Sequence, residues 1–189
     1  MSLIIPVGED DHFQGSLDAP AILVEYGDYQ CPNCGAAYHV VKALQERFKD
    51  DLCFVFRNMP LTQTHRHAQL AAEGAEAAAA QDKFWEMHDG LYENQANLGP
   101  GLLERLARAL DLNIERFEED LAAHHFHGRV RRDFMGGVRS GVNGTPTFFI
   151  NGERYNGYAD EEELAVAIEQ VLNHPGSRKD SADRPHTRR

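Results

Sequence analysis

Two cysteines stand at the junction between a predicted strand and a predicted helix. The stretch EYGDYQCPNCGAAYHVVKALQERF, residues 25–48, contains Cys31 and Cys34, with Pro32 and an asparagine between them. Before this stretch, the continuous apolar run at residues 21–24 is typical of a strand that is covered on both faces of a sheet. After it, apolar residues recur at helical spacing, and Pro32 suits a first helical turn. The dithiol is therefore predicted to open a helix that follows a buried strand.

The remaining elements give the order β-α-β, a block of helices, then β-β-α. A second apolar strand, LCFVFRNMPL, follows the first helix, and two strands joined by a helical crossover are parallel. The next seventy-odd residues are Ala-rich and favour helices, with residues 113–142 predicted as one of them. Strand signals return in TPTFFI, where Asn151-Gly152 predicts a hairpin turn, and a helix ends the pattern at residues 160–174.

The sheet residues come from both ends of the chain, so the helical block is predicted to be an insertion into one α/β domain. We expect residues 12–62 and 138–174 to form that domain, residues 63–137 to form the helical insertion, and residues 175–189 to be a disordered polar tail. A length of 189 residues suits one domain with such an insertion.

Charge and composition narrow the possible partners. Thirty acidic against nineteen basic residues give a formal charge of −11, which repels nucleic acid phosphates and anionic lipid, so neither is an expected partner. No apolar run approaches the roughly 18 residues of a membrane helix. The N-terminus lacks the features of a secretory signal, and cysteines are few, so a cytoplasmic location is predicted, or a periplasmic one if a signal has been removed.

Three interpretations of the CxxC pair have to be weighed. A structural zinc site needs four ligands, but only Cys53 remains, and the His-rich stretches at residues 65–67 and 124–127 have no matching cysteine pair. A structural disulfide closing so short a loop stabilises little. A redox dithiol has a positive argument, because helix N-terminal amides and the helix dipole favour a thiolate at Cys31. Cys34, one turn later, lies within reach for a disulfide.

The chain resembles the DsbA-like branch of the thioredoxin superfamily. The strand-CPNC-helix unit, the segment GTPTFFING and the helical segment KFWEMHDGLYENQ carry the resemblance, which runs from about His12 to about Leu172. It implies an α/β, thioredoxin-like fold with an inserted all-helical domain. It also implies a thiol:disulfide oxidoreductase that needs no bound cofactor or metal. Its partners would be protein or small-molecule thiols and disulfides and a separate recycling partner.

The same resemblance assigns roles to the site residues. It makes Cys31 the exposed nucleophile and Cys34 the more buried resolving thiol, and it implies a cis bond between Thr145 and Pro146 beside the disulfide. The motif residue Asn33 stands where the best-known DsbA-like oxidants carry a histidine. The direction of electron flow therefore stays open.

Glu25 also matches the family pattern, six residues before the first cysteine. A lone carboxylate in the run AILVEY should be desolvated, which raises its pKa and lets it relay the Cys34 proton. The alternative is an inert, hydrogen-bonded acid at the end of the strand. The site expected from the sequence thus consists of the catalytic residues Cys31, Cys34 and Glu25. The motif residues Pro32 and Asn33 and the Thr-Pro pair form the loops around them.

Other chemically capable residues are predicted to be structural. Cys53 is expected to be a buried core thiol, and Trp85 and its aromatic neighbours to be helix core. His39 is expected to be solvated or packed, and the basic run of Arg129, Arg131 and Arg132 to be a solvated helix face. Two other functions remain open. One is an enzyme on the same fold that acts on glutathione conjugates, as the kappa-class transferases do, although those typically keep a single Ser or Cys. The other is a non-catalytic peptide-binding module.

Overall fold

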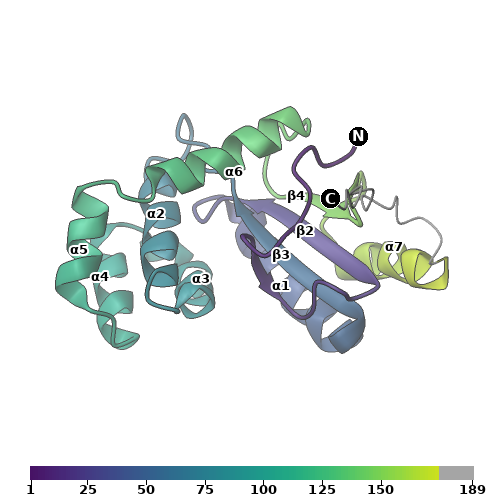
Figure 1. Cartoon of the computed structure of the whole chain (residues 1–189), viewed down its shortest axis with the longest axis horizontal. Coiled ribbons are helices and arrows are strands. Elements are labelled where there is room, and N and C mark those ends of the chain that lie inside the picture. The colour runs from purple at the N-terminus through teal and green to yellow at the C-terminus, as the bar shows by residue number, and fades with distance from the viewer. Residues whose placement is uncertain (175–189) are drawn as a thin grey trace, which may run out of the picture.

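A single mixed sheet forms the centre of the part of the chain that the computed structural model describes, residues 1–174 (Figure 1). Its strand order is β1-β3-β2-β4-β5. Strands β2 and β3 are parallel, as the predicted crossover requires, and the other three pairings are antiparallel. The strands are β1 (His12–Gln14), β2 (Ala21–Gly27), β3 (Leu52–Asn58), β4 (Thr147–Ile150) and β5 (Glu153–Arg154).

The hairpin between β4 and β5 forms at the predicted turn. Asn151 and Gly152 have φ angles of 47° and 83°, the left-handed values that make an Asn-Gly pair suitable for a tight hairpin. In contrast, β1 was not predicted. Its three residues, HFQ, carry no apolar run, and they form a strand because they pair with the edge of β3.

Helices cover both faces of the sheet and produce two buried apolar clusters. Helices α1 (Pro32–Phe48) and α7 (Glu161–Asn173) pack on one face, where they enclose residues such as Leu23 and Phe54. Helix α6 (His127–Arg139) and the N-terminal segment lie on the other face, with Val24 at its centre. Strand β2 therefore has buried side chains on both faces, as its continuous apolar run predicted.

The remaining helices form a group beside the sheet, at the left of Figure 1. The stretch 113–142, predicted as one helix, is interrupted at His124, whose φ of 51° ends the helical path. Helix α6 then runs back towards β4 and crosses the predicted limit at residue 137, so the predicted domain division stays a prediction. The helices of this group are α2 (Ala68–Ala79), α3 (Phe84–Glu93), α4 (Pro100–Ala109) and α5 (Ile114–Ala122).

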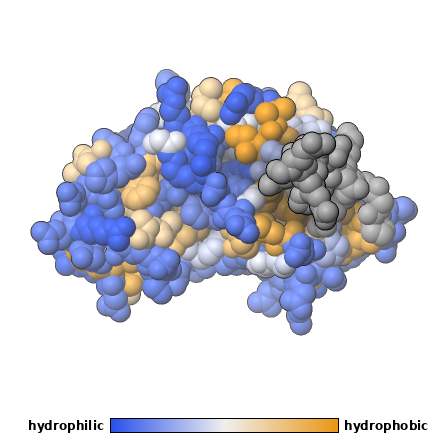
Figure 2. All heavy atoms as spheres, viewed as in Figure 1, coloured by the Kyte–Doolittle hydropathy of each residue, from blue (hydrophilic) through white to orange (hydrophobic). Residues whose placement is uncertain are grey.

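The surface is largely hydrophilic on the face shown in Figure 2, as the high content of charged residues suggests. An apolar group lies near the C-terminal end of α6, where Met135 and Val138 are exposed (Figure 2). None of the helices in residues 1–174 is both long enough and apolar enough to cross a membrane. The predicted disordered tail, residues 175–189, lies outside the described residues.

Candidate active site

Both cysteines of the CPNC motif lie at the N-terminus of α1. Cys31 is the N-cap, with extended backbone angles of −72° and 121°, and Pro32 opens the first turn. Cys34 is completely buried, whereas 6% of Cys31 is exposed. Cys31 is thus the more accessible of the two thiols, although it is less open than the sequence led us to expect. Both thiols are free in this structure.

The two thiols are held in different electrostatic states. A hydrogen bond from Cys34 lowers the pKa of Cys31 to about 5; burial opposes this, and Thr145 and the amides of Cys34 and Asn33 stabilise the thiolate further. The pKa of Cys34 is raised, first by burial, then by its hydrogen bond to Cys31 and by the charge of Glu25. At neutral pH, Cys31 is therefore a thiolate and Cys34 a thiol.

Glu25 lies in the middle of β2, opposite Phe56 of β3 and Phe148 of β4. Only 2% of its surface is exposed, and its Oε1 has no hydrogen-bond partner among the described residues. Burial, and then the charge of the Cys31 thiolate, raise the pKa of Glu25 to about 8. The charge of Glu25 in turn raises the pKa of Cys34, so the carboxyl and the resolving thiol are electrostatically coupled.

The loop before β4 closes the site from the other end of the chain. The Thr145–Pro146 bond is cis, and the Cys31 sulfur lies 3.3 Å from the Thr145 carbonyl oxygen, to which the thiol donates a hydrogen bond when it is protonated. Beside Pro146 lies a small pocket of about 190 Å³. Pro32 and Asn33 are exposed; the Asn33 side chain makes no hydrogen bond within residues 1–174, and only its backbone amide contributes to the thiolate.

Two further residues hold the motif in place, and sequence reasoning missed both. The Gln95 side chain, just after α3, donates to the carbonyl oxygens of Tyr29 and Cys31 at 2.9 and 2.8 Å. The buried Asp28 donates its backbone N–H to the Cys34 sulfur at 3.4 Å, and its carboxylate pairs with His65 at 2.8 Å. Gln95 is the last residue of the segment KFWEMHDGLYENQ that carried the resemblance, and Asp28 lies in the GDYQC stretch before the motif, but neither received a role from the sequence.

Cys53 lies in β3 within the apolar cluster on the opposite face of the sheet from the dithiol. It is completely buried, and burial together with the charge of Asp11 raises its pKa to about 11. The thiol is thus protonated and packed, as expected of a core cysteine.

The other residues set aside from the sequence mostly occupy structural positions. Trp85 packs in an aromatic group with Phe84 and His88, and His39 is exposed. Arg129, in contrast, is not simply solvated, because it pairs with Asp133 at 2.8 Å. Within residues 1–174, no group of three His, Cys, Asp or Glu side chains is arranged to hold a metal ion.

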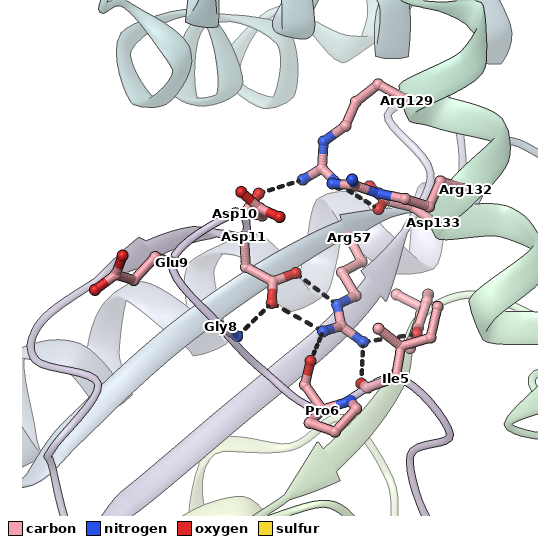
Figure 3. Close-up of a pocket in the computed structure, with 11 residues that line it drawn as sticks. Ile5, Pro6, Gly8, Glu9, Asp10, Asp11, Arg57, Arg129, Arg132 and Asp133 are labelled. Carbon is pink, nitrogen blue, oxygen red and sulfur yellow. Dashed lines mark hydrogen bonds and ion pairs between the residues drawn. The ribbon is translucent and has the colours of Figure 1, made fainter. Parts of the chain in front are cut away.

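A cavity of about 430 Å³ lies behind the sheet, and several of the charged groups in its lining are paired with one another (Figure 3). The buried Arg57 guanidinium binds both carboxylate oxygens of Asp11 at 2.8 and 2.9 Å. It also donates to the carbonyl oxygens of Ile5 and Pro6 and to the Tyr26 hydroxyl. This network fastens the N-terminal segment to the sheet, on the face away from the dithiol.

An ionised Cys31 beside a protonated Cys34, at the start of a helix on this sheet, is the arrangement that thiol–disulfide exchange chemistry requires. Residues 8–170 match the model of a family described as thioredoxin, so the chain belongs to the thioredoxin family, in its DsbA-like branch.

Solved structures with the same fold include BdbD from Bacillus subtilis, at 30% identity and a TM-score of 0.79, covering 86% of this chain and 93% of that one. Alpha-DsbA1 from Wolbachia pipientis has 20% identity and a TM-score of 0.78, covering 92% and 96%. Among curated proteins, the Na(+)/H(+) antiporter NhaA 3 of Salinispora tropica is 45% identical over 169 residues, which cover 89% of this chain and 26% of the antiporter. The chain therefore spans about a quarter of the length of such relatives.

Proposed function

We propose that the chain is a thiol:disulfide oxidoreductase that exchanges its Cys31–Cys34 dithiol or disulfide with protein or small-molecule disulfides. The observation that carries this proposal is the opposite shift of two neighbouring thiol pKa values, downward at Cys31 and upward at Cys34. A thiolate nucleophile beside a protonated resolving thiol is what a two-step exchange requires. The DsbA-like relatives support thiol–disulfide exchange in general.

In the reducing direction, the Cys31 thiolate attacks one sulfur of a substrate disulfide. A mixed disulfide forms, and the other substrate sulfur leaves as a thiolate. Cys34 then loses its proton to the Glu25 carboxylate and attacks the Cys31 sulfur, which releases the second substrate sulfur as a thiolate. The protein ends as the Cys31–Cys34 disulfide and the substrate has gained two electrons. The same steps in reverse oxidise a dithiol substrate.

No bound cofactor is needed for this cycle, because the dithiol itself carries two electrons; a separate thiol or disulfide partner would restore the starting state. For the NhaA proteins, we propose that the part shared with this chain is likewise a thiol–disulfide exchange unit. The support for this is that the thioredoxin-family match covers the same region of the chain. The cytoplasmic location stays a prediction from the sequence.

An insulin reduction assay with dithiothreitol tests the proposal. Wild-type protein should accelerate insulin precipitation, and Cys31→Ser should abolish the acceleration. Cys53→Ser is the matched control, since it removes a buried thiol behind the sheet, and it should retain the wild-type rate. If wild-type protein fails to accelerate the reaction although its dithiol is oxidised and reduced by glutathione, the peptide-binding alternative gains over catalysis.

A further inference from the structure

The hydroxyl of Tyr92 points from the helical block into the active-site side of the sheet. Its ring, on α3, is held among the rings of Tyr29, Tyr38 and His88, with centroid separations of 5.0, 5.3 and 5.0 Å. The residue is 6% exposed, and its buried hydroxyl has no hydrogen-bond partner among the described residues. A buried tyrosine hydroxyl usually finds such a partner, so its orientation calls for an explanation.

Gly27 shows where this hydroxyl lies. A Cβ atom added to Gly27 would lie 3.0 Å from the Tyr92 oxygen and 2.3 Å from the Phe56 ring. Glycine is therefore required here for close approach, because any side chain would displace the hydroxyl from the surface of β2. The Tyr92 oxygen thus rests directly on the strand that carries Glu25.

Glu25 and Gly27 are two positions apart in β2, so they face the same side of the sheet. The Glu25 Oε1 is the other buried polar atom at this place without a partner in residues 1–174. The pKa of Tyr92 is raised, first by burial and then by the charges of Cys34 and Glu25, so its hydroxyl stays protonated and can donate. The Tyr92 hydroxyl, a donor without an acceptor in residues 1–174, and the Glu25 Oε1, an acceptor without a donor there, therefore lie on the same face of β2, over positions 27 and 25.

We propose that Tyr92 is a positioning residue for the Glu25 carboxyl, to which its hydroxyl donates through a single bridging water. This role of Tyr92 rests on the proposed function, and it gives the helical block a part in the step in which Cys34 attacks the mixed disulfide. Hydrogen bonding to the ionised carboxylate favours the form that accepts the Cys34 proton. Tyr92 itself does not carry the proton. The titratable groups around the Glu25 carboxyl, from the elements packed against it, are Cys31, Cys34, Tyr29 and Tyr92, with His88 bound to the Tyr29 hydroxyl.

The test uses Tyr92→Phe, which removes the hydroxyl and keeps the ring in its aromatic surroundings. Tyr38→Phe is the matched control: its ring stacks on that of Tyr92, but its hydroxyl donates to Glu93 at 3.3 Å. The measurement is an NMR titration of reduced protein labelled at the glutamate carboxyl carbons, with Glu25→Gln to identify the signal. Tyr92→Phe should raise the Glu25 midpoint by about half a pH unit or more, roughly a threefold fall in the ionised fraction at a fixed lower pH.

The same shift should appear in the pH profile of the resolving step, measured as release of a thiol from the mixed disulfide. An unchanged Glu25 midpoint in Tyr92→Phe, or an equal shift in Tyr38→Phe, would overturn the proposal. The NMR titration needs no turnover, so it separates the two hypotheses. A shifted midpoint without insulin reduction would contradict only the proposed function, and normal reduction with an unshifted midpoint would contradict only the role of Tyr92.

Discussion

The sulfur of Cys31 and the carbonyl oxygen of Thr145 lie 3.3 Å apart, although 114 positions separate them in the chain. The nucleophile is presented by a helix from the first half of the fold, and the loop that faces it comes after the whole helical block. Thiolate chemistry at Cys31 therefore depends on the correct closure of the sheet through β2 and β4.

The first prediction concerns the titration of Cys31. In a Cys53→Ser background, the thiolate absorbance should show a midpoint at about 5. Cys34→Ala removes the leading stabilising hydrogen bond and should raise this midpoint towards the free-thiol value of about 8.5, whereas Cys34→Ser keeps a donor and should raise it less. A wild-type midpoint near that of a free thiol would contradict the described geometry.

The second prediction separates the roles of the two thiols. Cys34→Ser should accumulate a mixed disulfide with a disulfide substrate, because the Cys31 thiolate remains and the resolving thiol is gone. Cys31→Ser should accumulate none, since the remaining thiol of the pair is buried and protonated. Peptide mapping by mass spectrometry measures both, and air-oxidised wild-type protein should contain only the 31–34 bridge. Equal trapping by the two variants would refute the assignment.

The third prediction concerns the pH dependence of stability in the reduced protein. The pKa of Glu25 rises from 4.5 to about 8 on folding, so between these values the folded state binds a proton that the unfolded state has lost. The stability that Glu25 contributes is therefore fully present below the unfolded-state pKa of 4.5, and it is lost progressively as the pH rises to the folded-state pKa of about 8. Above pH 8, the free energy of unfolding of Glu25→Gln should therefore exceed that of wild type by about 5 kcal/mol, because about 1.4 kcal/mol accompanies each pKa unit between 4.5 and 8.

Near pH 4, where the glutamate is already neutral, the variant and wild type should have nearly equal stability, which provides the internal control. Urea unfolding at both pH values measures the difference. A constant difference at all pH values would mean that the ionisation of Glu25 is not coupled to folding.

The fourth prediction concerns the reduction potential. Because Cys31 is stabilised as a thiolate without a cationic side chain in the motif, we expect a potential between about −270 and −120 mV. Asn33→His should move the potential towards the oxidising end, since an imidazolium next to the dithiol further stabilises the reduced form. Equilibration with glutathione measures both proteins. No change in Asn33→His would show that groups outside the motif determine the potential.

The sequence was most informative where one local pattern carries both structure and chemistry. The run before Glu25, the CPNC helix start and the Asn151-Gly152 turn each lie where they were predicted, because each depends on neighbours only a few residues away. The break at His124 was missed, since an αL residue between two helical stretches leaves little compositional signal.

Tertiary contacts account for what the sequence could not predict. Gln95 reaches Cys31 and Tyr29 only after α3 has packed against the sheet, and its own segment resembles any polar helix end. Tyr92 appeared only as a core aromatic, because the closeness of its hydroxyl to Gly27 depends on the third dimension. Strand β1 likewise exists through its partner β3.

The two hydrogen bonds from Gln95 also bear on how such a fold can evolve. The carbonyl groups of Tyr29 and Cys31 are satisfied by a side chain from the helical block, and the core face over Phe56 is filled by rings from α3. Deleting the block would leave the turn before the nucleophile without its clamp and expose apolar surface behind it. The part of the chain that carries the dithiol therefore depends on the helical block, and recombination that joins this region to another protein has to transfer both parts together.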